Sequence, residues 1–369
     1  MESSKNKTVA VGMSGGVDST IAAYLLKEQG YNVVGLTMSI WDNSIDIPDI
    51  GKSGCYGPGE ARDIEAAKDI AKKLGIKHVV VDLSKEYKGT VLKYFCSEYT
   101  CGKTPNPCVI CNQKVKFGFL MQRAKEMGIN YDYFATGHYV RTEYEDNHKR
   151  YLLKKAIDST KDQSYFLSYL KQEQLEKLIF PLGDKTKTEI KELARKIGFT
   201  DVADKDESQD FIETDDYSVL FDKGDIKEGD FVDVEGKKIG RHKGIIYYTI
   251  GQRKGLGISG GNSGILYVLK IDADTNTIVV GPEKYLFSDE LRAANINWIS
   301  ISELTAPMEI RVKIRQQHKE AQAIITPCIG ESSKDQATVK FKTPQRAITP
   351  GQTVVFYDKD IVIGGGIIL

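Results

Sequence analysis

One short stretch, V-G-M-S-G-G-V-D-S from Val11 to Ser19, constrains the fold more than any other part of the sequence. It follows a β-branched run and precedes apolar residues at helical spacing, which predicts a strand, a tight glycine turn and a helix beginning near Asp18. Gly15 and Gly16 let the backbone turn and approach an anion closely, and the N–H groups that open the helix point to the same place. The stretch therefore predicts a phosphate-binding turn. It is not a Walker loop, because no Gly-Lys-Ser/Thr follows.

The first half of the chain alternates between predicted strands and amphipathic helices. Strands are expected at 8–13, 32–39, 78–82 and 131–136, and helices at 18–29, 60–74, 84–98 and 111–127. This alternation indicates βαβ units around a parallel sheet, in which ligands bind at the carboxyl ends of the strands. Ser14–Ser19, Leu36–Met38 and Thr136–Tyr139 all fall at such ends, so we predict that they line one nucleotide pocket.

The pattern changes further along the chain. The composition of 42–59 predicts a mobile loop, and 163–200 is expected to be helical, most clearly at 187–197. A strand and turn are expected at 231–236 and a hairpin at 267–280, and short strands at 309–314, 322–325, 337–341, 353–357 and 361–363 predict a small closed β-barrel. We therefore predict an α/β protein with three domains. These are a Rossmann-like domain with a parallel sheet over 1–205, a small central α+β domain over 206–287 and a C-terminal β-barrel over 288–369.

Charge and hydropathy limit the partners. The 51 basic and 51 acidic residues cancel, so binding of a nucleic acid would depend on local charge. Two runs lack acidic residues, Gly236–Lys254 and Arg311–Lys319, and we expect Arg315 of the second run to contact RNA.

No apolar run approaches the roughly 20 residues that span a bilayer, so no membrane partner is expected. The first residues lead directly into the first strand without a signal peptide, which favours a cytoplasmic location.

A second informative stretch, Cys101 to Phe117, carries clustered cysteines. Prolines on both sides of Asn106 end any earlier helix, so Cys108 and Cys111 are expected at the start of the next one. A helix amino terminus favours thiolate over thiol, and Lys114 and Lys116 add positive potential. In a reducing compartment this pattern indicates catalysis or metal binding, since thiolate is the form that both require.

A structural zinc site is the alternative for Cys96, Cys101, Cys108 and Cys111. Only one of their three spacings is the short C-x-x-C type, and Cys96 falls within a helical pattern, so the sequence favours a reactive pair of thiols. Cys55, in the predicted loop, and Cys328, beside a barrel strand, are expected to be bystanders.

Six motifs occur in order along nearly the whole chain: S-G-G-V-D-S, T-P-N-P-x-x-x-C-N-x-x-x-K-F, A-T-G-H-Y, K-D-Q-S-Y-F-L, E-S-Q-D and T-P-G-Q. The first resembles the loop of the PP-loop ATP pyrophosphatases, which split ATP into AMP and pyrophosphate. The whole set resembles the tRNA-specific 2-thiouridylases. That family thiolates carbon 2 of the wobble uridine, using ATP and, commonly, a protein-borne persulfide. The resemblance implies a PP-loop domain, a small central domain and a C-terminal β-barrel.

The resemblance also implies roles for individual residues. ATP and Mg²⁺ would bind at Gly12, Met13, Ser14, Gly15, Gly16, Val17, Asp18, Ser19, Met38 and Gly137. Within that set, Asp18 would hold the magnesium ion. The anticodon stem-loop of a tRNA would contact Asn106, Pro107, Cys108, His138, Lys161, Asp162, Gln163, Gln316 and Gln352. The implied reaction adenylates uracil O2, after which sulfur attacks carbon 2 and AMP leaves. The implied sulfur donor is a cysteine desulfurase, a relay protein or sulfide.

The chain departs from the commoner family pattern at the residues that handle sulfur. The family usually has Asp where Cys108 stands, Cys at Cys111 and a second Cys in a region that here reads Glu207–Ile212 and has none. Our hypothesis is that Cys108, Cys111 and Asp210 meet as catalytic residues and hold a four-iron four-sulfur cluster, in which three ligands leave one iron open. The alternative is a local relay, in which one thiol carries a persulfide and the other resolves it as a disulfide.

Two other functions fit parts of the pattern. A PP-loop ligase or amidotransferase would adenylate a small molecule and deliver nitrogen, and it should survive Cys111→Ser. A non-catalytic tRNA-binding scaffold would need neither the loop glycines and Asp18 nor the paired thiols.

Overall fold

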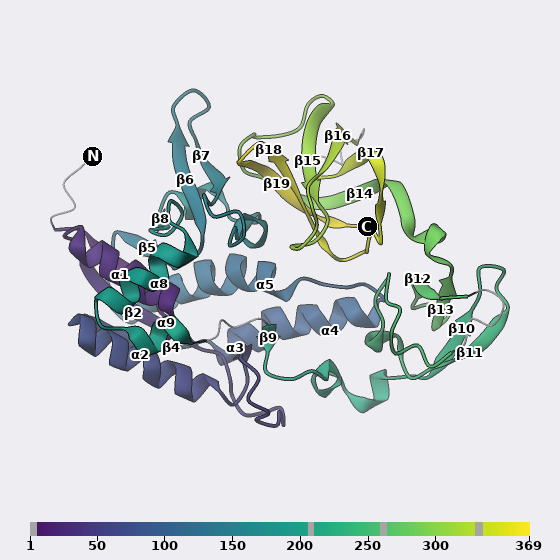
Figure 1. The fold of residues 1–369 in the computed structure, drawn as a ribbon, viewed down its shortest axis with the longest axis horizontal. Helices are drawn as coiled ribbons and strands as arrows, with labels where there is room; N and C mark the ends of the chain where they lie inside the picture. The colour runs from purple at the N-terminus through teal and green to yellow at the C-terminus, as the bar shows by residue number, and fades with distance from the viewer. Residues whose placement is uncertain (1–5, 206–209, 259–263, 329–334) are drawn as a thin grey trace. The chain divides into compact units, whose positions relative to one another are not determined.

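The computed structural model describes residues 6–205, 210–258, 264–328 and 335–369. The chain divides into two compact units (Figure 1). The first consists of Met1–Val91, Cys108–Asp215 and Asp360–Val362, and the second of Leu92–Pro107, Asp216–Lys359 and Ile363–Leu369. Segment Leu92–Pro107 thus groups with the second unit, which the order of elements along the chain did not predict.

A five-stranded parallel sheet forms the centre of the first unit. Its strand order is β4-β2-β1-β5-β8, with β1 at Thr8–Gly12, β2 at Asn32–Ser39, β4 at Lys77–Asp82, β5 at Tyr133–Ala135 and β8 at Leu178–Ile179. The predicted parallel sheet is confirmed. The prediction that 163–200 is helical throughout is wrong at β8, where two apolar residues complete the edge of the sheet.

The helices of the first unit vary in length and winding. They are α1 (Val17–Glu28), α2 (Glu60–Leu74), α3 (Ser84–Tyr87), η1 (Lys88–Leu92), α5 (Pro107–Ile110), η2 (Cys111–Phe119), α6 (Leu120–Glu126), η3 (Ser164–Leu167), α7 (Gln172–Leu175), α8 (Lys187–Lys196) and α9 (Thr200–Asp204). The expected helix over 111–127 forms, but its first part, η2, is wound as a π-helix. Such windings often occur at functional sites.

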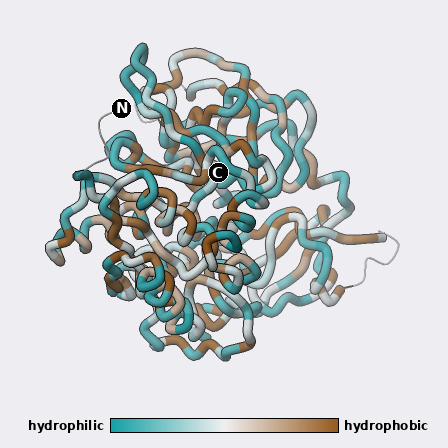
Figure 2. The backbone as a smooth tube through the Cα atoms, turned by 60° about the vertical axis from the view of Figure 1, so that its left-hand side comes forward, coloured by the Kyte–Doolittle hydropathy of each residue, from teal (hydrophilic) through white to brown (hydrophobic). Residues whose placement is uncertain are grey.

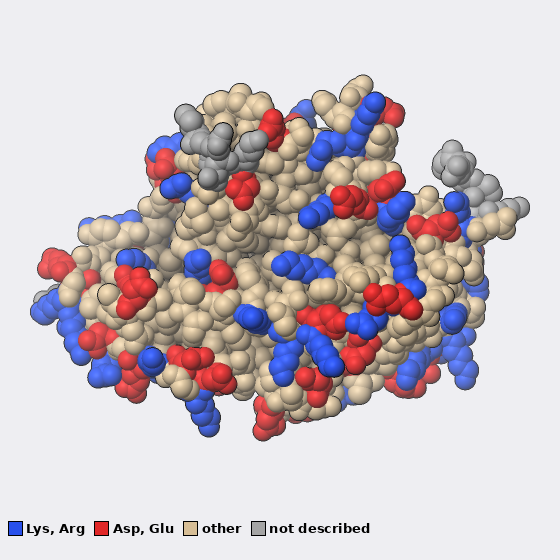
Figure 3. Space-filling model, turned by 180° about the vertical axis from the view of Figure 1, so that it is seen from behind, with Lys and Arg blue, Asp and Glu red and all other residues tan. Residues whose placement is uncertain are grey.

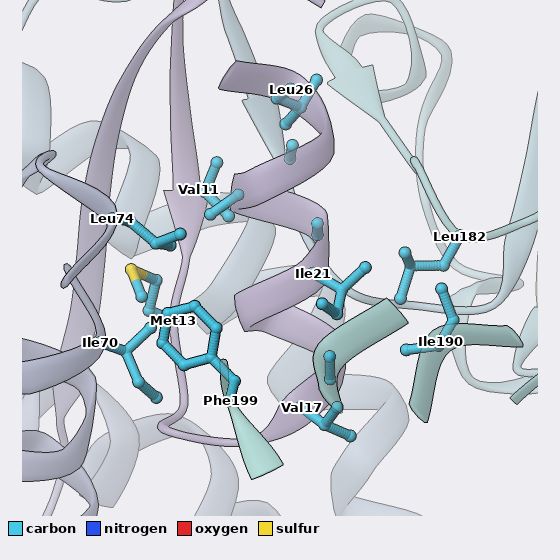
Figure 4. Packing of buried hydrophobic residues seen from close by; sticks show 14 of the residues in the cluster. Val11, Met13, Val17, Ile21, Leu26, Ile70, Leu74, Leu182, Ile190 and Phe199 are labelled. Carbon is cyan, nitrogen blue, oxygen red and sulfur yellow. The ribbon is translucent and has the colours of Figure 1, made fainter. Parts of the chain in front are cut away.

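Residues on both sides of the predicted phosphate-binding turn pack into the core of this unit. Figure 4 shows Ile21 of α1 and Val11 of β1 among the buried side chains of the cluster. Met13 and Val17, which flank the turn, are 3% and 4% exposed and belong to the same cluster. Both residues were predicted to bind the nucleotide. Since their side chains lie in the core, any contact of these two residues with a ligand would involve their backbone atoms.

Two smaller pairings complete the first unit. β3 (Gly54–Tyr56) lies within the predicted loop 42–59 and pairs in parallel with β9 (Asp210–Ile212). β6 (Val140–Glu145) and β7 (Arg150–Lys155) form an antiparallel hairpin that the sequence analysis missed. Ile361 pairs with Lys154 of β7.

The second unit contains a four-stranded sheet with the order β11-β10-β13-β12. Its strands are β10 (Gly229–Val232), β11 (Lys238–His242), β12 (Tyr267–Asp272) and β13 (Thr277–Gly281), and β12 with β13 is the predicted hairpin. Phe231, Tyr248, Val268 and Ile278 pack in its core. The helical segments of this unit are α4 (Lys93–Thr100), η4 (Tyr217–Leu220), η5 (Lys223–Asp225), η6 (Ile245–Tyr247) and η8 (Glu283–Leu286).

The last six strands close into the predicted β-barrel. Their order is β14-β17-β16-β15-β18-β19, and β14 pairs with β19 to close it. They span β14 (Phe287–Trp298), β15 (Met308–Lys313), β16 (Ala321–Pro327), β17 (Ala337–Arg346), β18 (Thr353–Asp358) and β19 (Ile361–Ile368). Buried and exposed residues alternate along β15 and β16.

Figure 2 shows hydrophobic and hydrophilic residues mixed along the chain. Within the described ranges, no helix is long and apolar enough to cross a bilayer.

Candidate active site

The two glycines of the predicted phosphate-binding turn have different roles. Gly15 has a φ of +73°, and a Cβ there would lie 2.8 Å from the Asp63 carbonyl oxygen, so a side chain would be both strained and blocked. Gly16 has an ordinary φ of −100°, and a Cβ would meet only Ser14 Oγ at 3.6 Å. Gly15 therefore makes the turn, and Gly16 keeps the space in front of it open.

Hydroxyl groups hold the turn against the start of α1. The Ser14 N–H donates to Ser19 Oγ at 3.2 Å, and Ser19 Oγ donates to the Gly16 carbonyl at 3.1 Å. No side chain caps the amino end of α1, so its first N–H groups are available to an anion. The geometry suits a phosphate.

Asp18, in the first turn of α1, is bound by two side chains that the sequence analysis did not connect with it. Lys187 Nζ lies 2.7 and 2.8 Å from the two carboxylate oxygens, and the Tyr139 hydroxyl donates to Oδ1 at 2.7 Å. Lys187 is only 8% exposed and Tyr139 only 2%. The turn thus has a charge-paired cluster at its head, in which Lys187 and Tyr139 are buried and the Asp18 side chain is 28% exposed.

The sequence around Lys187 explains its position. Thr186 and Glu189 form a capping box, in which the Glu189 N–H donates to Thr186 Oγ1 and the Glu189 carboxylate accepts the Thr186 N–H. This fixes the start of α8, so that Lys187 is its first residue. The capping box is visible in the sequence, but its place beside Asp18, 169 residues away, is not.

The three predicted strand ends come together as expected. Thr37 Oγ1 donates to the Met13 carbonyl at 2.8 Å, which joins the ends of β2 and β1. A Cβ at Gly137 would lie 2.6 Å from the Asp18 carbonyl carbon, so this segment touches the start of α1. Met38, near the end of β2, is partly exposed. The segments can therefore line a single pocket.

Cys108 and Cys111 lie at the predicted helix start, with Pro107 as the first residue of α5. The expectation that the helix terminus and lysines favour the thiolate is wrong for the free thiols. Burial raises the pKa of Cys111 to about 12 and the pKa of Cys108 further, although Lys116 opposes both shifts. Desolvation outweighs the positive charge, so both groups are thiols at neutral pH.

Cys55, expected to be a bystander, lies within electrostatic range of this pair. A charge on Cys55 raises the pKa of both Cys108 and Cys111. Only its position in the folded chain reveals this, because the nearer of the two cysteines is more than fifty residues away in sequence.

Asp210 lies near Cys108 but is already paired. Its carboxylate is 3.1 Å from Lys52 Nζ, which also donates to the Thr214 carbonyl at 2.9 Å. Its negative charge contributes to the raised pKa of Cys108. Among the described residues, no group of three or more His, Cys, Asp or Glu side chains is placed to hold a metal ion. The ligand set predicted for an iron–sulfur cluster is therefore not assembled, and Glu207–Gln209 lie outside the described residues.

Several residues predicted to contact tRNA make internal contacts. Asp162 is 6% exposed and accepts hydrogen bonds from the Ala156 N–H and the Ser164 hydroxyl. Gln163 Oε1 accepts the Tyr139 N–H at 2.9 Å. His138 Nδ1 lies 2.7 Å from Thr136 Oγ1, and burial lowers the pKa of His138 well below its usual value. These contacts support the A-T-G-H-Y segment. Lys161, next to Asp162, is partly exposed.

The T-P-G-Q and T-P-N-P motifs meet within the second unit. The Thr104 N–H donates to the Pro350 carbonyl at 2.9 Å, and Gln352 Nε2 donates to the Pro105 carbonyl at 3.4 Å. Gly351 has a φ of +87°, and a Cβ there would lie 2.8 Å from Lys103 Cβ. The barrel motif therefore supports the segment that leads to Asn106 and Pro107.

The two basic runs differ in how far their charges are neutralised. In the first run, Lys238 pairs with Asp230 at 2.7 Å and Arg241 with Glu228 at 3.3 Å. In the second run, no carboxylate of the described residues pairs with Arg311. Arg315 and its neighbours line a recess of about 450 Å³ on the barrel, together with Gln317, His318, Lys319, Gln345 and Arg346. Acidic and basic side chains are otherwise interspersed on the face in Figure 3.

Comparison with known proteins identifies the family. Three family models match successive parts of the chain: a tRNA methyl transferase HUP domain over residues 7–213, a tRNA methyl transferase PRC-barrel domain over 218–282 and an aminomethyltransferase beta-barrel domain over 288–368. The tRNA-specific 2-thiouridylase MnmA 2 of Thermoanaerobacter sp. (strain X514) is 52% identical over 369 residues, which cover 98% of each chain. The tRNA-specific 2-thiouridylase MnmA of Acetivibrio thermocellus is 47% identical over 367 residues, covering 98% of this chain and 99% of the relative. This protein therefore belongs to the tRNA-specific 2-thiouridylase family.

Proposed function

We propose that the protein uses ATP to replace oxygen with sulfur at carbon 2 of the wobble uridine of tRNA. The names of its relatives support this activity. The observation that carries it is that one compact unit contains both the phosphate-binding turn with its Asp18–Lys187 pair and the Cys108–Cys111 pair. Nucleotide activation and sulfur delivery are the two halves of this reaction.

Uracil O2 is a poor leaving group and must first be activated. Its attack on the α-phosphate of ATP forms an adenylated oxygen and releases pyrophosphate. The Ser14–Ser19 turn and the α1 amino end hold the phosphates, and Lys187 supplies positive charge beside them. A magnesium ion at Asp18 would neutralise charge on the departing pyrophosphate, and Lys187, which lies 2.7 and 2.8 Å from the two carboxylate oxygens, would give up one of these contacts to it.

Sulfur then arrives as a nucleophile. The outer sulfur of a persulfide on Cys111 attacks carbon 2, and the bond to oxygen breaks as AMP leaves with its electron pair. The Cys108 thiol next attacks Cys111 Sγ. The bond from Sγ to the outer sulfur breaks, and the leaving 2-thiouridine takes the electron pair and the proton that Cys108 gives up. A thiol reductant returns the Cys108–Cys111 disulfide to two thiols with two electrons. Cys108 lies in α5, and Cys111 opens η2 three residues later, so both thiols belong to one continuous helical segment.

We prefer this relay to a cluster because, among the described residues, no three His, Cys, Asp or Glu side chains are grouped to hold a metal ion. The relay needs only the two thiols, Cys108 and Cys111.

The test is mass spectrometry of nucleosides from tRNA incubated with the protein, ATP and sodium polysulfide. We expect 2-thiouridine derivatives at the wobble position, together with one AMP and one pyrophosphate per sulfur inserted. Omission of ATP should abolish the product. Pyrophosphate release without any thionucleoside would contradict the proposal and favour a PP-loop ligase.

The barrel is proposed to bind the tRNA. Reversal of charge in the double variant Arg311→Glu and Arg315→Glu should weaken tRNA binding by about tenfold or more at low salt, because phosphate contacts are electrostatic. ATP binding should be unchanged. The measurement is a filter-binding or anisotropy titration with tRNA beside a nucleotide titration. Lys238→Glu with Arg241→Glu provides the comparison, since these residues are already ion-paired. Equal loss of tRNA and ATP binding in the Arg311 and Arg315 variant would refute the assignment.

A further inference from the structure

A third thiol, Cys55, lies within electrostatic range of the Cys108–Cys111 pair, on the strand β3 that pairs with β9. Gly54 lies opposite Asp210 and Tyr56 opposite Ile212 in this parallel pair. Side chains alternate along a strand, and here Gly54 and Tyr56 are buried whereas Cys55 is exposed. The register therefore fixes Cys55 on the outward face of β3.

Aromatic packing connects β3 with the helix that begins at Cys111. Tyr56 is fully buried and stacks on Tyr87, with ring centroids 5.4 Å apart and an interplanar angle of 14°. Tyr87 is the last residue of α3, which packs against η2. Burial raises the pKa of Tyr87 well above its usual value, and negative charge on Cys111, Cys55 or Cys108 adds to the rise, so this hydroxyl lies within electrostatic range of all three sulfurs.

Hydrogen bonds to the 210–215 segment anchor the loop on both sides of Cys55. On one side, Lys52 Nζ contacts Asp210 and Asp215 at 3.1 and 2.9 Å. On the other side, the Gly59 N–H donates to Glu213 Oε2 at 2.7 Å, and Glu213 is only 5% exposed. Cys55 is therefore presented by a constrained segment.

The three thiols share one basic neighbour but differ in access. Burial raises the pKa of Cys55, Cys108 and Cys111, and Lys116 opposes the rise at each of them, which groups the three thiols around one positive charge. Cys108 and Cys111 are partly buried, whereas Cys55 is exposed. A sulfur carrier as large as a protein can meet an exposed thiol more readily than an enclosed one.

We propose that Cys55 is the entry thiol, which accepts sulfane sulfur from a persulfide carried by a donor protein and passes it to the Cys108–Cys111 pair. In the first exchange the Cys55 sulfur attacks the outer sulfur of the donor persulfide, and the donor thiolate that leaves takes up the proton that Cys55 loses. In the second, a sulfur of the pair attacks the outer sulfur on Cys55, and Cys55 leaves and takes up the proton that the attacking thiol loses. Each exchange conserves electrons and needs no oxidant. This role rests on the proposed function.

The first test compares a protein donor with a small one. With a cysteine desulfurase that carries a persulfide, Cys55→Ser should form 2-thiouridine about tenfold more slowly or worse, because the exposed acceptor is lost. With sodium polysulfide, which can reach the inner pair, the rate should stay within about twofold of the unsubstituted protein. Cys101→Ser removes another exposed thiol and should match the unsubstituted protein with both donors.

The second test traps the intermediate. In the double variant Cys108→Ser and Cys111→Ser, treatment with the loaded desulfurase, alkylation and peptide mass spectrometry should show a persulfide on Cys55. A full rate for Cys55→Ser with the desulfurase, an equal loss with both donors, or no persulfide on Cys55 would each overturn the entry role. Failure of the unsubstituted protein to make 2-thiouridine with polysulfide would instead overturn the proposed function.

Discussion

Lys187→Met is expected to lower ATP-dependent pyrophosphate release by about 10²–10³-fold, the usual effect of removing one preorganised charge from a reacting phosphate. Lys187 contacts both oxygens of Asp18 and is nearly buried, so its ammonium is held at the head of the phosphate-binding turn. The measurement is pyrophosphate release in the presence of tRNA, ATP and polysulfide. Lys196→Met, at the exposed end of the same helix, should leave the rate unchanged.

A loss of folding must be distinguished from a loss of activity in this variant. Removing one partner of a largely buried ion pair lowers the free energy of unfolding by about 3 kcal/mol, because the other charge is left uncompensated. Asp18→Asn combined with Lys187→Met removes both charges and should recover much of the lost stability, measured by thermal unfolding, without recovering pyrophosphate release. A double variant that is both stable and active would show that the pair serves the fold alone.

Cys111→Ser should abolish tRNA thiolation, by about 10³-fold or more, while pyrophosphate release stays within a few-fold of the unsubstituted protein. The hydroxyl of serine cannot carry a persulfide, but nucleotide activation depends on the Ser14–Ser19 turn. The two rates are measured on one reaction, by nucleoside mass spectrometry and by pyrophosphate assay. Cys328→Ser, another partly buried thiol, is the matched control and should retain both rates.

The outcome for Cys111→Ser separates classes of enzyme. A PP-loop ligase that delivers nitrogen would keep its full activity, because no sulfur passes through the protein. Retained thiolation by this variant would therefore contradict the relay, and iron and sulfide bound to the unsubstituted protein after anaerobic purification would favour the cluster over it.

The parts of the fold that follow from local pattern were predictable. β2 and α2 occupy the predicted residues, because a β-branched run and an amphipathic period each specify one element. The barrel followed from evenly spaced short strands. The edge strand β8 was missed because two residues are too few to show an alternation of apolar and polar side chains. The β6–β7 hairpin was missed because its loop lacks a typical turn dipeptide.

The site was predictable where it lies within one segment and not where distant segments meet. The backbone conformation of Gly15 could be predicted from the local turn sequence. The contact of Lys187 with Asp18 could not, because it depends on the packing of α8 beside α1. The protonation of Cys108 and Cys111 depended on burial, which sequence spacing does not report. For the same reason, the nearness of Cys55 to these two residues appears only in the folded chain, through the charge interactions among the three sulfurs.

Met13 and Val17 have a consequence for experiments that infer function from tolerance to substitution. Both are anchored in apolar packing on either side of the Ser14–Gly16 bend. A change in side-chain volume at either position would disturb this packing and displace the backbone of the bend. A saturation scan of nucleotide binding would thus score both positions as sensitive, even though their side chains are only 3% and 4% exposed. Sensitivity to substitution at this turn would therefore extend to residues one layer beneath the surface.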